Sequence, residues 1–281
     1  MSNPLYTVSE EEKYFFDLRG YLIIRNALSD ADLAQCNATI DHYADQIQTR
    51  SIGNGGLSRG STALKGQEGR RELTGMLGWP TPHREPFRKL LVHPVVVSRL
   101  NEFSGQGFRL DHGPLLISAH KGAEGHSLHG AGEPFGQSVA YHQQNGKIYC
   151  RGITVAWQLT DVNPGDGGFA CVPGSHKSNF PMDLPKDVRT FERIPNYVCQ
   201  PEADAGDVII FTEALIHGTM PWNGDHERRA LLYKFSPGHS SWSLDYYNAD
   251  AYEGLTEQQK RILTPPCVGN RPDVVEITEE Y

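Results

Sequence analysis

Residues 153–172 read ITVAWQLTDVNPGDGGFACV, and this stretch predicts two strands joined by a turn. Both ends of it are rich in β-branched and aromatic residues, as strands are. The middle, Asn163–Gly168, collects Asn, Pro, Gly and Asp, which is a strong signal for a hairpin-type connection. Similar apolar runs recur at 115–117, 208–211 and 230–235. We therefore expect a sandwich or jelly roll.

Helical patterns precede these strands. Residues 10–18 and 87–103 carry apolar positions at helical spacing, and Ser29 is a good N-cap for a helix that follows the strand 20–25. The chain is thus predicted to be α+β and a single domain over 1–281. Its parts would be a mainly helical region 1–105, a β core 106–240 and a C-terminal extension 241–281.

The segment 50–75 differs in composition from its surroundings. It is rich in Gly, Ser, Arg and Glu, which indicates a mobile loop and a candidate lid. Its basic residues could meet a phosphate, CoA or carboxylate group, or could simply be solvated. These residues are Arg50, Arg59, Lys65, Arg70 and Arg71.

Composition excludes several classes of partner. The 281 residues carry a net charge of -8 without a basic face, which argues against nucleic-acid binding. No run approaches the roughly 18 apolar residues of a membrane span. We expect a soluble, cytoplasmic protein that does not bind membranes. The five cysteines are odd in number and lack CxxC spacing, so reduced, structural thiols are expected.

Two of the twelve histidines stand out. His129 and His217 each follow an apolar residue and precede a glycine. Such a ring could be presented from the end of a strand, at a place where another group approaches closely. Imidazole is a common ligand of iron, zinc and copper, so both are candidate metal ligands.

An ordered set of motifs resembles the phytanoyl-CoA dioxygenase family. The set spans nearly the whole chain: Phe15–Ser29, then Pro173-Gly174-Ser175-His176-Lys177, then Gly206–Phe211 leading to Ile216-His217-Gly218 and Arg228. The resemblance implies a double-stranded β-helix (a cupin-like jelly roll) with N-terminal helices packed outside. It also implies Fe(II) held at the mouth of the barrel by a His-x-Asp…His triad.

Residue by residue, His217 matches the distal histidine of that triad. Arg228 matches the arginine that binds the far carboxylate of 2-oxoglutarate, for which the guanidinium fork is suited. Arg229 is its neighbour on the opposite strand face, and the spacing favours Arg228 as the inward residue. Thr219 could donate its hydroxyl to the same carboxylate.

The His-x-Asp part of the triad differs in this sequence from the pattern of the family. His129 matches the proximal histidine, but Ala131 stands where the pattern has aspartate. An alternative alignment on His142 also lacks an acid. A chloride ion could fill the open position, as in relatives that chlorinate unactivated carbons and carry Gly or Ala there. Glu213, or less favourably Glu133, could supply a substitute carboxylate, or water alone could remain.

The resemblance therefore implies an Fe(II)- and 2-oxoglutarate-dependent oxygenase. It would use O2 to hydroxylate an unactivated C–H of a small molecule, with release of succinate and CO2. The alternatives are a halogenase and a catalytically silent jelly-roll binding protein. Candidates to shape the substrate pocket are Trp157, Gln158, Tyr149 and Tyr141. Neither the substrate nor the oligomeric state is indicated.

Overall fold

The computed structural model describes residues 4–52, 57–58, 60–130, 139–180 and 183–269. Its largest element is a seven-stranded sheet with the order β1-β10-β8-β12-β4-β3-β2. The strands are β1 (Tyr21–Ile24), β10 (Val208–Thr212), β8 (Ile153–Gln158), β12 (Arg228–Ser236), β4 (Arg109–Ala119), β3 (Arg71–Leu73) and β2 (Gln48–Thr49). All of its pairings are antiparallel.

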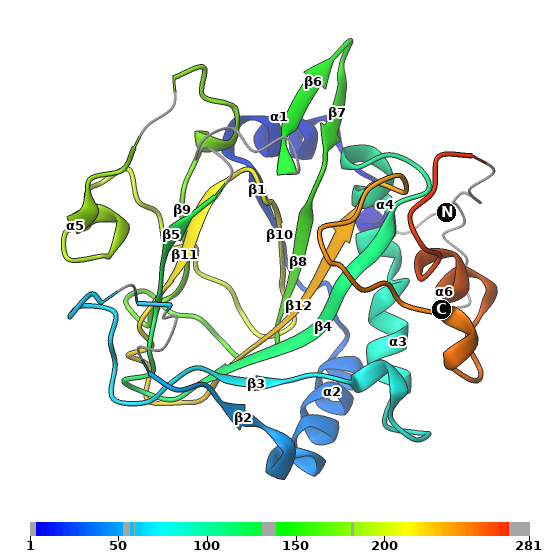
Figure 1. Ribbon diagram of the computed structural model, residues 1–281, viewed down its shortest axis with the longest axis horizontal. Coiled ribbons are helices and arrows are strands. Elements are labelled where there is room, and N and C mark those ends of the chain that lie inside the picture. The colour runs from blue at the N-terminus through cyan, green and yellow to red at the C-terminus, as the bar shows by residue number, and fades with distance from the viewer. Residues whose placement is uncertain (1–3, 53–56, 59, 131–138, 181–182, 270–281) are drawn as a thin grey trace.

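A smaller sheet faces the large one (Figure 1). It has the order β5-β11-β9, with β5 (His126–His129), β11 (Ile216–Met220) and β9 (Gly168–Val172). A separate hairpin consists of β6 (Tyr141–Gln144) and β7 (Lys147–Cys150). Two facing antiparallel sheets of this kind form the double-stranded β-helix, so the predicted jelly-roll core and the strands 115–117, 208–211 and 230–235 are confirmed.

The expected hairpin at Asn163–Gly168 is wrong. The strand before it, β8, pairs with β10 and β12 in the large sheet, whereas β9 pairs with β11 in the small sheet. All six residues of β8 are buried. A strand buried on both faces occupies the middle of a sheet with a partner on each side. The turn therefore carries the chain from one sheet to the other.

Helices cover the outer side of the large sheet (Figure 1). They are α1 (Glu10–Arg19), α2 (Asp30–His42), α3 (Glu85–Leu91) and α4 (Pro94–Phe103), with the short 3-10 turns η1 (Pro4–Tyr6), η2 (Ala44–Gln46) and η3 (Met76–Gly78). Ser9 and Glu12 form a capping box at the start of α1, and Gly20 ends that helix with a φ of 82°. The largest hydrophobic core lies beneath the helices, where the rings of Phe16 and Phe103 stack. None of the described helices has the length and apolar character needed to cross a bilayer.

The predicted helix 87–103 is two helices. Pro94 has no amide hydrogen and its ring excludes a continuous helix, so α3 ends at Leu91 and α4 begins at Pro94. The His93 side chain caps α4 by accepting a hydrogen bond from the amide of Val95. The break turns α4 against the core.

Described residues of the segment 50–75 pack against the small sheet and pair with the large one. Leu64 is fully buried with Leu128 and Ile216. The Ser61 hydroxyl donates a hydrogen bond to the carbonyl of Thr190. Arg71–Leu73 forms the short strand β3 rather than loop. The high glycine content predicted a mobile loop, because composition gives no information about these tertiary contacts.

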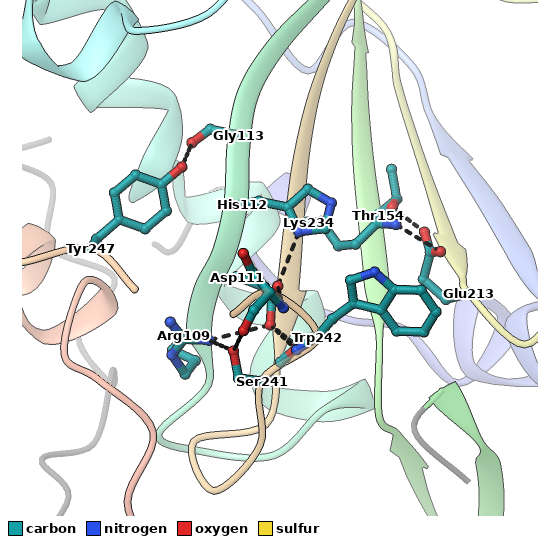
Figure 2. A network of polar contacts seen from close by, with 12 residues as sticks. Arg109, Asp111, His112, Gly113, Thr154, Glu213, Lys234, Ser241, Trp242 and Tyr247 are labelled. Carbon is teal, nitrogen blue, oxygen red and sulfur yellow. Dashed lines mark hydrogen bonds and ion pairs between the residues drawn. The ribbon is translucent and has the colours of Figure 1, made fainter. Parts of the chain in front are cut away.

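The C-terminal extension is tied to the core through Asp111, a fully buried residue of β4 (Figure 2). Its carboxylate accepts hydrogen bonds from Arg109, Ser236 and His112, and from the backbone amides of Trp242 and Ser243. The short elements η5 (Ser175–Lys177), α5 (Lys186–Arg189), η6 (Ala249–Ala251) and α6 (Glu257–Ile262) complete the described fold.

We expect Asp111→Ala to lower the free energy of unfolding by about 3–5 kcal/mol, because it leaves the buried Arg109 guanidinium without its partner. Burial alone would raise the pKa of Asp111, but the hydrogen bonds hold it well below its ordinary value. A carboxyl with a depressed folded pKa stabilises fully above its unfolded pKa of about 3.9, and this stability is lost as the pH falls toward the folded pKa.

Urea denaturation at neutral pH and at decreasing acidic pH measures both effects. In wild type, protonation of Asp111 contributes to the fall of the free energy of unfolding at acidic pH. The variant should lack this contribution. Asp225→Ala is the control, since Asp225 is exposed and its ion pair is with the exposed Lys121. Equal stability of the two variants would contradict the role assigned to Asp111.

Candidate functional site

A cavity of about 180 Å³ lies between the two sheets. Its walls come from β4, β8, β10 and β12 of the large sheet and from β5, β9 and β11 of the small one. His129, His217, Thr219, Glu213 and Arg228 all line it. The fold thus brings the main candidates for the metal and cosubstrate site to one cavity.

His129 and His217 lie opposite one another on the paired strands β5 and β11. Their ring centroids are 4.4 Å apart. Nδ1 of His129 lies 2.8 Å from the Ser127 carbonyl oxygen, and Nδ1 of His217 lies 2.7 Å from that of Leu215. A carbonyl can only accept, so each Nδ1 carries the proton and donates it. This orients Nε2 as the coordinating atom, as the outer hydrogen bonds of metal-bound histidines do.

The electrostatic setting keeps His217 neutral. Burial, together with the neighbouring His129, lowers the pKa of His217 to about 4. A metal ligand must be the neutral imidazole. His217 is therefore ready to coordinate at neutral pH without first losing a proton.

The glycines that follow the two histidines allow their strands to approach closely. A Cβ on Gly218 would lie 2.7 Å from the His126 carbonyl oxygen, and one on Gly130 would lie 2.5 Å from that of Leu215. The motif Pro173–Lys177 also supports this region, because the Ser175 hydroxyl accepts a hydrogen bond from the amide of Ile216. Main-chain contacts thus set the distance between the two rings.

Gly218→Ala is expected to weaken iron binding by about 10- to 100-fold, because the added methyl group pushes β5 away from β11 and separates the two histidines. A metal titration followed by calorimetry measures this. Gly269→Ala is a matched control, since no described atom beyond its chain neighbours lies within 4 Å of the added Cβ. Unchanged affinity in Gly218→Ala would show that strand spacing does not set the site.

The side chain of Arg228 extends into the cavity, and described residues do not satisfy all of its hydrogen-bond donors. It is 5% exposed, and its Nε and Nη1 have no hydrogen-bond partner in the described part of the chain. Burial and the nearby Arg70 lower the pKa of Arg228 to about 10, so the guanidinium stays charged at neutral pH. A buried charge without a partner is costly, and its fork fits a carboxylate. Thr219 lines the same cavity.

Arg229 lies on the other face of β12. Its guanidinium pairs with Asp41 at 2.6 Å and with Glu227 at 2.7 Å. The alternation of side chains along a strand therefore makes Arg228 the inward residue, as the spacing favoured. Gly168 faces Arg228, where a Cβ would lie 3.0 Å from Nε.

Glu213 is held by other side chains. The Thr154 hydroxyl and the Lys234 ammonium group donate to its two oxygens, the latter at 2.9 Å. Burial raises the pKa of Glu213, but Lys234 and His217 lower it further, to about 2. Across the described ranges, no group of three His, Cys, Asp or Glu residues could hold a metal ion. Glu213 thus does not complete a third ligand position in this structure.

Ala131 and Glu133 lie outside the described residues. His142 lies on the β6–β7 hairpin, is exposed, and does not line the cavity. Of the two alternative first ligands, the fold therefore places His129 beside His217.

Of the four residues expected to shape the substrate pocket, Gln158 lines the cavity. Trp157 is fully buried in the main core, where its ring contacts that of His93. Tyr149 is exposed, and the Tyr141 hydroxyl donates a hydrogen bond of 2.5 Å to Asp17.

Several cavity residues were missed from the sequence. The His126 ring stacks on His129 with centroids 4.2 Å apart. Residues three apart on a regular strand face opposite sides, so the spacing gave no signal. The register of β5 against β11 is irregular here, which explains the exception. Lys234 could have been found, because it is an even number of positions from Arg228 on the same strand.

Comparisons with known proteins agree with this geometry. The family model of phytanoyl-CoA dioxygenase (PhyH) matches residues 16–230. Dioxygenase af480 of Aspergillus fumigatus is 24% identical over 201 residues, which are 69% of this chain. That match spans 60% of the relative's own length.

Solved structures show the same fold. HygX from Streptomyces hygroscopicus, with nickel, 2-oxoglutarate and hygromycin B bound, is 22% identical with a TM-score of 0.66, and 87% of this chain and 94% of that one are covered. SnoN, a non-heme α-ketoglutarate-dependent epimerase from nogalamycin biosynthesis, is 17% identical with a TM-score of 0.59, and the match covers 95% and 98% of the two chains.

Proposed function

This chain belongs to the phytanoyl-CoA dioxygenase family, and on that premise we propose that it is an Fe(II)- and 2-oxoglutarate-dependent oxygenase. Arg228 carries the proposal. Two nitrogens of its buried guanidinium have no partner in the part of the chain that the structure describes, and they lie in the cavity that also holds the His129–His217 pair. A diacid that bridges a metal ion and a guanidinium suits this arrangement. HygX, whose fold is similar, has 2-oxoglutarate and a metal bound.

The residues present fit these groups. His129 and His217 would hold the iron through Nε2, since backbone carbonyls occupy Nδ1 of each ring. Arg228 would bind the far carboxylate of 2-oxoglutarate, with Thr219 as a second donor. When bound, iron and cosubstrate supply the oxidising power, with O2 consumed and succinate and CO2 released. Phe169 and Phe211 add apolar ring surface to the cavity wall, and such surface would favour the exclusion of water once the ligands are bound.

Iron analysis of anaerobically reconstituted protein, combined with an assay of 2-oxoglutarate-dependent succinate release, tests the proposal. We expect stoichiometric iron and succinate formation that requires O2. Absence of both iron and 2-oxoglutarate binding would favour the silent jelly-roll binding protein instead.

Halogenation is a second candidate activity, because Ala131 occupies the place of the triad aspartate. An iron site without that carboxylate has one more open position, which chloride could take. Hydroxylation and halogenation are separated by product analysis with and without chloride. A chlorinated product that is lost in Ala131→Asp would establish halogenation. Hydroxylation that is independent of chloride would exclude it.

A further inference from the structure

Two positively charged side chains of strand β12 line the cavity, one near each end of the strand. Arg228 and Lys234 both line it and share a face of β12. Six residues of strand separate their Cα atoms by about 20 Å. The proposed function places 2-oxoglutarate at the Arg228 end, and the inference below depends on that placement. The Lys234 end is then left for the substrate.

Lys234 lies between a carboxylate and an aromatic ring. Its ammonium group pairs with Glu213 at 2.9 Å and lies 5.6 Å from the centre of the Trp242 ring. Figure 2 shows the indole beside this ion pair. The protein has four tryptophans, and Trp242 is 55% exposed while the other three are buried. A large ring is thus presented next to the polar end of the cavity.

The position of Trp242 is fixed from the core. Its backbone amide and that of Ser243 donate to the buried carboxylate of Asp111, at 2.7 and 3.0 Å. Asp111 is itself paired with the fully buried Arg109. A backbone held in this way limits the positions that the indole can reach, so less ordering is needed when a ligand packs on it, which favours binding.

The cations around the cavity have carboxylate partners, with one exception. Lys234 pairs with Glu213, and Arg70 pairs with Glu72 and also feels the charge of the buried Glu124. An adjoining pocket of about 450 Å³ contains Arg50, which also pairs with Glu72. Among the described Arg and Lys residues that line the two pockets, Arg228 alone lacks a carboxylate partner. The site therefore offers one place for an anion, and 2-oxoglutarate would fill it.

The second ligand should then be uncharged but rich in hydrogen-bonding groups. A hydroxyl group both donates and accepts, so it can bind the carboxylate and the ammonium of one ion pair. Glu213 would repel an anion, and a fatty acyl chain would strip water from the pair without replacing its hydrogen bonds. The flat indole of Trp242 can pack against the C–H face of a ring.

We propose that the substrate carries a polyhydroxylated ring, such as a sugar or cyclitol unit, which hydrogen-bonds to the Lys234–Glu213 pair and packs on the exposed surface of the neighbouring Trp242 ring. Trp242 and Lys234 are then specificity-determining residues, and Asp111 is a positioning residue for Trp242.

Isothermal titration calorimetry on the full chain, loaded anaerobically with Fe(II) and 2-oxoglutarate, tests this proposal. The probes are myo-inositol, methyl α-glucoside and sucrose, with palmitoyl-CoA as the acyl alternative. We expect at least one hydroxylated ring to bind and palmitoyl-CoA not to bind. Trp242→Ala should weaken that binding by about tenfold or more, because the stacking surface is lost.

Two further variants complete the design. The double variant Lys234→Met/Glu213→Gln removes both charges together, so neither is left buried without its partner, and it should also lose the hydroxylated probe. Leu244→Ala is the control, because Leu244 is 95% exposed on the same segment and does not line the cavity.

The 2-oxoglutarate affinity of every sample is measured separately. If wild type does not bind 2-oxoglutarate, the proposed function fails. If it does, three results overturn the substrate proposal: binding of palmitoyl-CoA alone, no binding of any hydroxylated probe, or probe binding that Trp242→Ala leaves unchanged.

Discussion

Arg228→Met is expected to abolish 2-oxoglutarate binding and to make the ligand-free protein more stable. Loss of a buried, hydrogen-bonded charge partner weakens binding by about 2–5 kcal/mol, which corresponds to roughly 30- to 5000-fold in Kd. Nε and Nη1 of the same guanidinium have no hydrogen-bond partner among the described residues, and the side chain is 5% exposed. Its replacement by an apolar side chain of similar length should raise the free energy of unfolding, on the order of 1–4 kcal/mol.

Calorimetric titration with 2-oxoglutarate and thermal unfolding of the ligand-free protein measure the two effects. Arg229→Met is the matched control on the adjacent residue. Arg229 pairs with Asp41 and Glu227 on the outer face, so its loss should leave 2-oxoglutarate affinity unchanged and should not stabilise the protein. If Arg228→Met bound 2-oxoglutarate normally, the cosubstrate would not be at this end of the cavity.

The combination of the two effects is more informative than either alone. A structural arginine stabilises the folded state, so its removal lowers the melting temperature. An arginine that serves to bind a ligand lowers the stability of the protein until the ligand is bound, because its charge is buried without a full set of partners. A substitution that raises stability but weakens 2-oxoglutarate binding therefore identifies an arginine that anchors a ligand, whereas one that lowers stability identifies a structural ion pair.

His129→Ala and His217→Ala are each expected to reduce bound iron and succinate formation to background. With Ala131 in place of the triad aspartate, His129 and His217 are the two protein ligands that we propose for the metal. The loss of either would halve that set and should weaken Fe(II) binding severely. Metal analysis after anaerobic reconstitution, followed by the succinate assay, gives the measurement.

Two controls make this result specific. His142→Ala should retain iron, because His142 is exposed on the β6–β7 hairpin and does not line the cavity. Glu213→Gln should also retain iron, because Thr154 and Lys234 engage both of its carboxylate oxygens. Loss of iron in His142→Ala with retention in His129→Ala would reverse the choice of first ligand. Loss of iron in Glu213→Gln would restore Glu213 as a ligand.

Local signals in the sequence determined much of the fold. Ser9, Ser29 and Gly20 mark helix ends through hydrogen bonds and backbone conformations within a few residues, so the boundaries of α1 and the start of α2 were predictable. The alternation of side chains along a strand likewise predicted that Arg228 and Arg229 face opposite sides, and the spacing from His217 favoured Arg228 as the inward residue. Each of these features depends on neighbours in the chain.

Tertiary structure alone decided the features that depend on distant partners. Turn residues at Asn163–Gly168 specify a chain reversal but not which strand lies beside the next one, and β9 joined the other sheet. The pairing of β5 with β11 placed His129, rather than His142, opposite His217. The Glu213–Lys234 pair and the link from Trp242 to Asp111 join positions 21 and 131 residues apart. Such contacts form because the packing of whole sheets removes water from charged groups and amides. A charge or an amide without water needs a hydrogen-bonding partner, since leaving it unpaired is costly. Local periodicity in the sequence gives no information about which distant residue becomes that partner.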